Sequence, residues 1–280
     1  MTVAPTPALN DVSYGQFARF LAQRLGITLG ENKQYLVSSR LSMVMREFDA
    51  LDINEFIARA IDGKNTSLTE RALESMTTNE TFWFRDEYPY QILANDLLPA
   101  IAKTTQKLRI WSSACSYGQE PYSIAMVISE FKRRQPSAFS AGVEIIASDI
   151  SQKVLKFASD GIYDELAIAR GLPTAMQDRY FSRVDKSKLK VNESIKSMVS
   201  FKRVNLLDSF YALGKFDIIF CRNVLIYFDA DNKASILQKL AALLPADGAV
   251  MLGAAESVSG AEDVLKMEKC ARGLYYRRRA

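Results

Sequence analysis

The stretch FDIIFCRNVLIYFD, residues 216–229, decides the fold prediction because it places two polar residues between two apolar runs. The run FDIIFC has the length and apolarity of a strand buried on both faces of a parallel sheet. Arg222 and Asn223 then fall at the carboxyl end of that strand, where open α/β sheets bind their ligands. We therefore predict that this pair reaches a ligand. The alternative is an arginine paired for structural reasons at a strand end.

Apolar strands alternate with amphipathic helices from about residue 108 onward, which predicts a doubly wound parallel α/β sheet. Between about 163 and 200 this alternation is interrupted by helix caps and short alternating segments, which we interpret as an inserted small β-subdomain. The expected strands are LRIWSSA (108–114), VEIIASD (143–149), VSFKRVN (199–205), FDIIFCR (216–222) and GAVMLGA (248–254), followed by a last pair at 264–269 and 273–279.

The chain before residue 77 shows only helical periodicity, which predicts a small all-helical domain. Helix starts are expected at three capping pairs, Ser13 with Gln16, Asp52 with Glu55, and Ser67 with Glu70. The predicted organisation is a disordered start (1–12), a helical domain (13–76), a linker and connector helix (77–100), and the α/β domain with its inserted subdomain (101–280).

The composition excludes several classes of function. The 280 residues include no histidine, which removes the usual general base at neutral pH and the commonest metal ligand. The three cysteines lie far apart and form no zinc motif, so no metal is expected. A net charge of +4 is too mild to indicate nucleic acid. No membrane-spanning apolar run or signal peptide is present, so we expect a cytoplasmic protein without membrane insertion.

Two acidic residues near predicted strand ends indicate the kind of ligand. Asp149 ends the second strand and is placed to accept from the two hydroxyls of a ribose; a helix cap is the alternative role. Glu120 lies at the start of the helix that follows the first strand. The turn before it has Gly118 but no G-x-G-x-x-G pattern, which disfavours a dinucleotide pyrophosphate. A nucleoside without phosphates fits better, and S-adenosyl-L-methionine is the common one bound by such sheets.

The runs TTNETFWFRD, WSSACSYGQEPYS, IIASDIS, VNLLD and FDIIFCRNVLIYFD, in this order, resemble the chemotaxis receptor glutamate O-methyltransferase family, CheR. The resemblance covers nearly the whole chain and implies a Rossmann-like S-adenosyl-L-methionine-dependent methyltransferase domain. It also implies methyl transfer to glutamates on chemoreceptor cytoplasmic helices, with S-adenosyl-L-homocysteine as the product. The positions that it implies for cofactor contact are Asn79, Thr81, Arg85, Glu120, Asp149, Asn205, Leu206, Arg222 and Asn223.

Residue chemistry agrees with several of these implied roles. Glu120 could face the cofactor's ammonium group, and Asn205 with Leu206 suits the edge and face of adenine. Arg85 is a predicted catalytic residue that orients a carboxylate, and whether that carboxylate belongs to substrate or cofactor stays open. Tyr227, which the resemblance places near the methyl group, is the second predicted catalytic residue; an aromatic packed at a helix start is the alternative.

The resemblance also implies that basic residues Lys33, Arg40 and Arg46 contact acidic receptor helices. At roughly 100° per residue, Lys33 and Arg40 share one side of the predicted helix, whereas Arg46 points nearly opposite. Some family members bind a receptor pentapeptide at the subdomain by strand addition. The segment here lacks a glycine-rich turn, so this tethering is doubtful.

Two rival functions stay open at this point. One is a methyltransferase acting on RNA or on a small molecule, although the chain lacks a basic and aromatic platform for single strands. The other is a signalling adaptor that binds cofactor or receptor without turnover.

Overall fold

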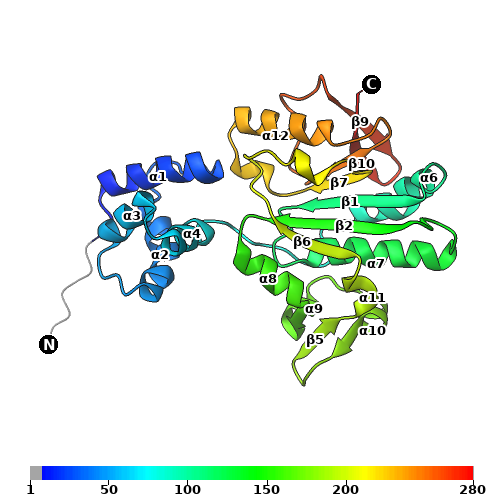
Figure 1. Cartoon of the computed structure of the whole chain (residues 1–280), viewed down its shortest axis with the longest axis horizontal. Coiled ribbons are helices and arrows are strands. Elements are labelled where there is room, and N and C mark those ends of the chain that lie inside the picture. The colour runs from blue at the N-terminus through cyan, green and yellow to red at the C-terminus, as the bar shows by residue number, and fades with distance from the viewer. Residues whose placement is uncertain (1–7, 280) are drawn as a thin grey trace. The chain divides into compact units, whose positions relative to one another are not determined.

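The structure is a computed structural model that describes residues 8–279, and they form two compact units (Figure 1). The helical unit contains the chain up to Thr78 together with Tyr227–Asp229. The α/β unit contains Asn79–Ile226 and the chain from Ala230 onward. Residues 1–7, most of the predicted disordered start, lie outside the described residues.

Four helices build the helical unit: α1 (Asp11–Leu25), α2 (Gln34–Glu47), α3 (Ile53–Asp62) and α4 (Thr66–Ser75). Their apolar stripes meet in a core in which Phe17, Leu21, Val37, Leu41 and Phe56 are fully buried. This is the arrangement that amphipathic periodicity produces when short helices bury one face each. The all-helical prediction for this region is confirmed.

Two of the three predicted capping pairs are wrong. Helix α1 begins three residues earlier than expected, because the cap is Asn10 and not Ser13: the Asn10 side chain accepts from the backbone N–H of Ser13. Helix α4 begins before Ser67, because the Asn65 side chain accepts from the N–H of Leu68. Asparagine caps a helix as well as serine does, and in both places a nearby asparagine takes the capping position. Asp52 does cap α3, as predicted.

The α/β unit is built on a seven-stranded sheet with the order β6-β2-β1-β7-β8-β10-β9. The first five strands in this order are parallel, whereas β10 runs antiparallel to both of its neighbours. The chain leaves the centre through β1, β2 and β6 and returns at β7 on the other side of β1, so the order reverses between β1 and β7. The strands are β1 (Lys107–Ser113), β2 (Gly142–Asp149), β6 (Val199–Arg203), β7 (Ile218–Cys221), β8 (Ala249–Leu252), β9 (Leu265–Cys270) and β10 (Gly273–Arg278).

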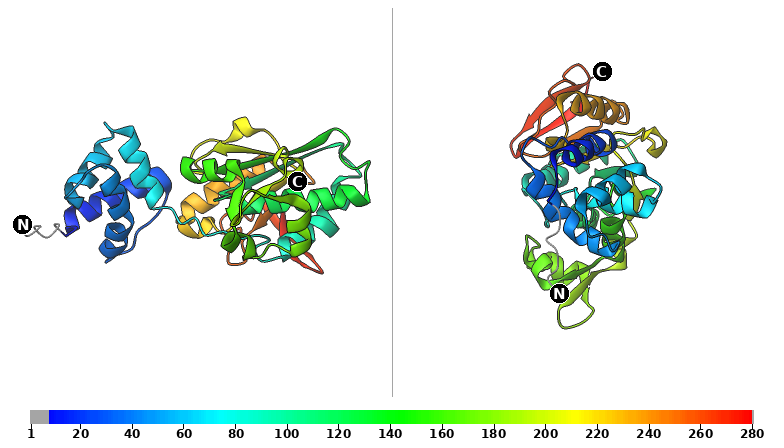
Figure 2. Two further views of the ribbon diagram at one scale, coloured as in Figure 1. Left: turned by 90° about the horizontal axis from the view of Figure 1, so that it is seen from below. Right: turned by 90° about the vertical axis from the view of Figure 1, so that its left-hand side faces the viewer.

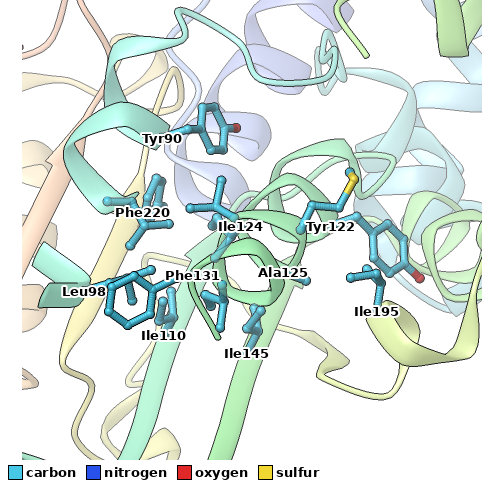
Figure 3. Packing of buried hydrophobic residues seen from close by; sticks show 14 of the residues in the cluster. Tyr90, Leu98, Ile110, Tyr122, Ile124, Ala125, Phe131, Ile145, Ile195 and Phe220 are labelled. Atoms are coloured by element: carbon cyan, nitrogen blue, oxygen red, sulfur yellow. The ribbon is translucent and has the colours of Figure 1, made fainter. Parts of the chain in front are cut away.

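Alternate residues of each strand point to opposite faces of the sheet, and each face is covered by other parts of the unit. Ile110, Ile145 and Phe220 pack with residues of α5 to α7 in one large buried cluster (Figure 3). The neighbouring residue Trp111 faces the other way and packs on Phe210 and Phe216. The remaining elements of the main body are α5 (Tyr88–Ile92), η1 (Leu93–Leu97), α6 (Leu98–Ile101), α7 (Gln119–Arg134), α8 (Gln152–Asp160), η2 (Tyr211–Leu213) and α12 (Ala230–Ala242). The short helix η3 (Leu225–Tyr227) begins in this unit, and its last residue is counted with the helical unit.

The predicted connector helix is part of the α/β core. Leu93, Leu97 and Leu98 are almost completely buried in the same cluster as Ile110 and Phe220. Figure 3 shows Leu98 close to Phe220 and Ile110. The segment from Asn79 to Ile101 therefore folds with the sheet, and the part of the predicted linker that precedes α5 is only 79–87.

The inserted subdomain lies between α8 and β6 in the chain and projects from the β6 side of the main sheet (Figure 1 and Figure 2). Its three antiparallel strands pair in the order β3-β5-β4. This confirms the predicted small β-insertion. Its elements are β3 (Ile162–Asp164), α9 (Glu165–Ala169), α10 (Thr174–Tyr180), β4 (Phe181–Arg183), β5 (Lys188–Val191) and α11 (Glu193–Lys196).

Candidate functional site at the strand ends

The carboxyl ends of the central strands lie level with one another. Ser113 of β1 is in register with both Ser148 of β2 and Cys221 of β7, and Cys221 is in register with Leu252 of β8. The polar residues that follow these positions are therefore brought to one edge of the sheet, next to the point where the strand order reverses. We call this edge the strand-end site.

The side chain of Asp149, the last residue of β2, accepts hydrogen bonds from the backbone of two turns. Its Oδ2 accepts from the N–H of Ser116 at 2.9 Å, and its Oδ1 accepts from the N–H of Ser151 at 3.0 Å. The cap of α8 is Ser151, so the alternative role of Asp149 as the helix cap does not apply. Both oxygens of the Asp149 carboxylate therefore accept from backbone N–H groups in the turns that follow β1 and β2.

Glu120 and Arg222 form a buried pair across the β1–β7 junction. Arg222 Nη1 lies 2.9 Å from Glu120 Oε2, and Ser112 donates to the other carboxylate oxygen at 2.8 Å. Burial raises the pKa of Glu120, against the opposing effect of Arg222 and Ser112. Arg222 also binds Asp86 at 2.7 Å and the carbonyl oxygen of Arg85 at 3.0 Å.

The Arg222 side chain is paired for structural reasons at the strand end, because it is only 1% exposed and bonded to two carboxylates. Its Nε is buried without a hydrogen-bond partner. Arg222 can therefore contribute to ligand binding only indirectly, by positioning Glu120 and the turn that carries Asn223.

Strained backbone is concentrated around the strand-end site. Nine non-glycine residues have positive φ in the described part of the chain, and six of them follow strands β1 and β7 or lie in the 79–87 segment. Such conformations cost free energy and cluster at functional sites, where the surrounding structure enforces them. The six residues are Phe84, Asp86, Glu87, Ala114, Ser116 and Asn223.

The 79–87 segment is tied to the strand-end site and to the subdomain. The hydroxyl of Ser116, whose backbone binds Asp149, donates to the carbonyl oxygen of Asn79 at 3.0 Å. Trp83 is buried and donates its backbone N–H and its indole N–H to the carbonyls of Arg170 and Ala167. Two predicted site residues, Asn79 and Arg85, thus lie in a segment held from both sides, and Thr81 is half-buried between them.

Arg85 stacks on an aromatic ring within the same segment. Its guanidinium carbon lies 5.4 Å from the centroid of the Phe82 ring, and Arg170 of the subdomain lies 5.7 Å from it. Arg170 also forms an ion pair with Glu80, and Arg85 donates to the carbonyl of that residue. These contacts hold the guanidinium of Arg85 while leaving the residue half-buried.

Asn205 and Leu206 follow β6 next to the Asp149 end of β2. The N–H of Val204 donates to the carbonyl of Asp149 at 3.1 Å, which places the next two residues beside that strand end. Leu206 is buried, and its carbonyl accepts from Lys239. The backbone of Asn205 and Leu206 therefore begins beside the end of β2 that carries Asp149.

Comparison with protein-family models decides the relationship. Residues 79–274 match the model described as "CheR methyltransferase, SAM binding domain", and residues 13–77 match "CheR methyltransferase, all-alpha domain". The chain belongs to the CheR methyltransferase family. The matched ranges correspond closely to the α/β unit and the helical unit. The fold predicted from the sequence, a Rossmann-like methyltransferase sheet with an N-terminal helical domain, is therefore confirmed.

Curated relatives of the family align with almost the whole chain. The chemotaxis protein methyltransferase of Vibrio parahaemolyticus is 43% identical over 96% of this chain and 98% of its own length. Chemotaxis protein methyltransferase 1 of Pseudomonas aeruginosa is 44% identical over 95% and 98%. The Escherichia coli chemotaxis protein methyltransferase is 32% identical over 91% and 87%.

The three predicted receptor-contacting residues differ in their surroundings. Lys33, directly before α2, and Arg46, in its last turn, are exposed. Arg40 is half-buried, and its guanidinium donates to the carbonyls of Met76 and Thr77 and to Thr78 Oγ1. Arg40 therefore joins α2 to the end of α4 within the helical unit. Tyr227, the predicted methyl-proximal residue, ends η3 and is half-buried.

Sequence reasoning missed four polar residues of the strand-end site: Ser112, Ser116, Asp86 and Glu256. Both serines lie in the quoted run WSSACSYGQEPYS, Ser112 within the predicted strand at 108–114 and Ser116 just after it, so the position of Ser116 was an available signal. Asp86 binds Arg222 across the fold, which no local pattern indicates. Glu256 follows the end of β8, and it would have been found by extending the strand-end argument to this fifth parallel strand.

The donor chemistry fits S-adenosyl-L-methionine. A cationic nucleoside with a ribose diol and an ammonium group is complementary to the carboxylates of Asp149 and Glu120. Within residues 8–279, no group of three or more histidine, cysteine or acidic side chains is arranged to hold a metal ion. None of the helices in the same range is both long and apolar enough to span a membrane.

Proposed function

We propose that this protein transfers the methyl group of S-adenosyl-L-methionine to glutamate side chains on the cytoplasmic helices of chemoreceptors, forming methyl esters and S-adenosyl-L-homocysteine. The observation that carries this proposal is the match of the two CheR family models to residues 13–77 and 79–274. The relatives named chemotaxis protein methyltransferase support it over nearly the full chain. A cytoplasmic location is part of the proposal.

The strand-end site supplies groups that would hold the cofactor. Asp149 would accept from the ribose hydroxyls, and Glu120 would face the ammonium group. Asn205 and Leu206 would bind the edge and face of the adenine. The remaining proposed contacts come from the 79–87 segment and from the turn after β7, namely Asn79, Thr81, Arg85 and Asn223. The predicted contact by Arg222 is proposed as an indirect one through Glu120, because the Arg222 side chain is only 1% exposed.

The chain's lack of histidine is compatible with this reaction. When bound, the cofactor supplies an electrophilic methyl group on a sulfonium. A glutamate side chain with a reference pKa of about 4.3 is already ionised at neutral pH, so it needs no general base. The protein has to align this carboxylate with the methyl group and remove water from it. We assign orientation of a carboxylate to Arg85 and placement of the methyl end to Tyr227.

Receptor recognition is proposed for the basic residues of the helical unit. Lys33 and Arg46 are exposed and suited to contact an acidic helix. For Arg40 we propose an indirect contribution, because its guanidinium joins α2 to the chain after α4.

The deciding experiment measures transfer of labelled methyl to a receptor cytoplasmic fragment, followed by mild base. A glutamate methyl ester releases labelled methanol, whereas N-methyl products keep their label. Asp149→Ala should abolish most of the transfer, and Asp160→Ala, which removes an exposed aspartate of the same unit, should leave it unchanged. A base-stable product contradicts the proposal. Binding of S-adenosyl-L-homocysteine without any transfer would instead favour the adaptor.

A further inference from the structure

Glu256 holds four backbone N–H groups with one carboxylate. Its Oε2 accepts from the N–H groups of Asn223 at 2.8 Å and Gly253 at 2.7 Å. Its Oε1 accepts from the N–H groups of Val224 at 2.9 Å and Leu225 at 2.7 Å. We call this arrangement the Glu256 clamp. It joins the chain after β8 to the turn after β7.

The clamp lies under a strained turn. Asn223 has φ of 57°, and the N–H groups of Asn223, Val224 and Leu225 point toward the same anion. Successive N–H groups that converge in this way form a concave anion site, which a bound carboxylate stabilises. Without the carboxylate, these partly buried N–H groups would lose their acceptor, and the left-handed conformation of Asn223 would lose the bonds that offset its cost.

Gly253 makes room for the clamp. A Cβ atom at this position would lie 2.7 Å from Glu256 Oε2, 2.8 Å from Asn223 Nδ2 and 2.9 Å from the Asn223 nitrogen. These separations are far below normal contact, so any side chain at position 253 would push the carboxylate or Asn223 out of place. The same distances show that the Asn223 side chain lies directly beside the Glu256 carboxylate.

We propose that Glu256 is a positioning residue for cofactor binding: its carboxylate holds the turn after β7 in the conformation that presents Asn223 to the ligand. This inference rests on the proposed function, because it assigns the strand-end site to S-adenosyl-L-methionine. Glu256 acts through the backbone of the turn, and it was not among the residues expected to contact the cofactor. Glutamate suits this position because its side chain is long enough to reach the turn and carries two oxygens, each of which accepts from two backbone N–H groups.

Glu256→Gln tests the inference with little change in shape. Glutamine has one acceptor oxygen, and its NH₂ group would face two backbone donors. We expect the Kd for S-adenosyl-L-homocysteine, measured by titration calorimetry, to rise about 10- to 100-fold, as is typical when charge-assisted hydrogen bonds are lost. Glu262→Gln is the matched control, because Glu262 is exposed and accepts from a single backbone N–H, that of Gly260. It should leave the Kd unchanged.

The binding stoichiometry separates positioning from general stability. If Glu256 only stabilised the fold, Glu256→Gln would lower the fraction of competent molecules while the Kd of that fraction stayed at the wild-type value. A raised Kd with a stoichiometry near one supports positioning. Gly253→Ala provides a second variant in case Glu256→Gln fails to fold, since it keeps the charge and displaces it.

A wild-type Kd in the folded variant overturns the inference. These measurements need no receptor, so they are separable from the proposed reaction. Wild-type protein that binds S-adenosyl-L-homocysteine but methylates no receptor fragment would refute the proposed function and leave the role of Glu256 standing.

Discussion

Arg222→Met should strongly destabilise the α/β unit. The Arg222 side chain is 1% exposed and that of its partner Glu120 is 13% exposed, so the substitution leaves a carboxylate nearly buried without its counter-charge. Breaking a buried pair in this way costs about 3–5 kcal/mol. Asp86, at 31% exposure, is solvated and should add little. For a unit of this size, the loss corresponds to a fall in Tm of roughly 6–20 °C.

Tryptophan fluorescence is suited to the measurement, because both tryptophans of the chain, Trp83 and Trp111, are buried in the α/β unit. Urea unfolding followed by this signal therefore reports on the unit that contains Arg222. As a control, Arg133→Met removes an arginine that is 56% exposed and should change stability by less than about 0.5 kcal/mol.

The double variant Arg222→Met with Glu120→Gln isolates the reason for the loss. It removes both charges of the buried pair, so it should recover a large part of the stability lost by Arg222→Met alone. Two results would refute the reasoning. One is an Arg222→Met protein within about 1 kcal/mol of wild type, and the other is a double variant whose loss equals or exceeds the sum of the single losses.

Three further predictions concern pH, packing and capping. Burial raises the pKa of the Glu120 carboxyl above its ordinary 4.5. The stability that the protonated carboxyl contributes is therefore fully present below pH 4.5 and is lost as pH rises through the folded-state pKa. Glu120→Gln should flatten this fall of Tm with pH, and an unchanged slope would contradict the prediction. Gly118→Ala should cost about 1–3 kcal/mol in tryptophan-monitored urea unfolding, because φ is +91° and a Cβ would lie 2.8 Å from that of Ala158; a neutral effect would show that the turn relaxes. Asn65→Ala should destabilise the helical unit by about 1 kcal/mol by circular dichroism, whereas Ser67→Ala should have little effect, and the reverse order would restore Ser67 as the cap.

The architecture was predictable because its signals are local and repeated. The predicted strand at 216–222 has the apolar centre IIFC, which is typical of a strand covered on both faces in a parallel sheet, and Asp149 ends a strand of the same kind. Since parallel strands end at one edge, sequence position alone brought Asp149 and Asn223 to the same part of the fold.

The parts that were missed depend on choices between equivalent residues or on distant contacts. Asn10 and Asn65 cap helices where nearby serines had equal capping propensity. The partners of Arg222 and Glu256 come from segments far away in the chain, and no periodic pattern encodes which carboxylate meets which donor. Pairings of this kind are set only when the tertiary fold closes.

The position of β10 has a consequence for the order in which the molecule is made. This strand lies between β8 and β9, although it follows both in the chain. During synthesis the parallel strands emerge first, and the edge of β8 waits unpaired until residues 273–278 leave the ribosome. An uncovered strand edge invites pairing with other chains. The β8 edge is therefore completed last, and until β10 pairs with it this edge is open to pairing with another chain.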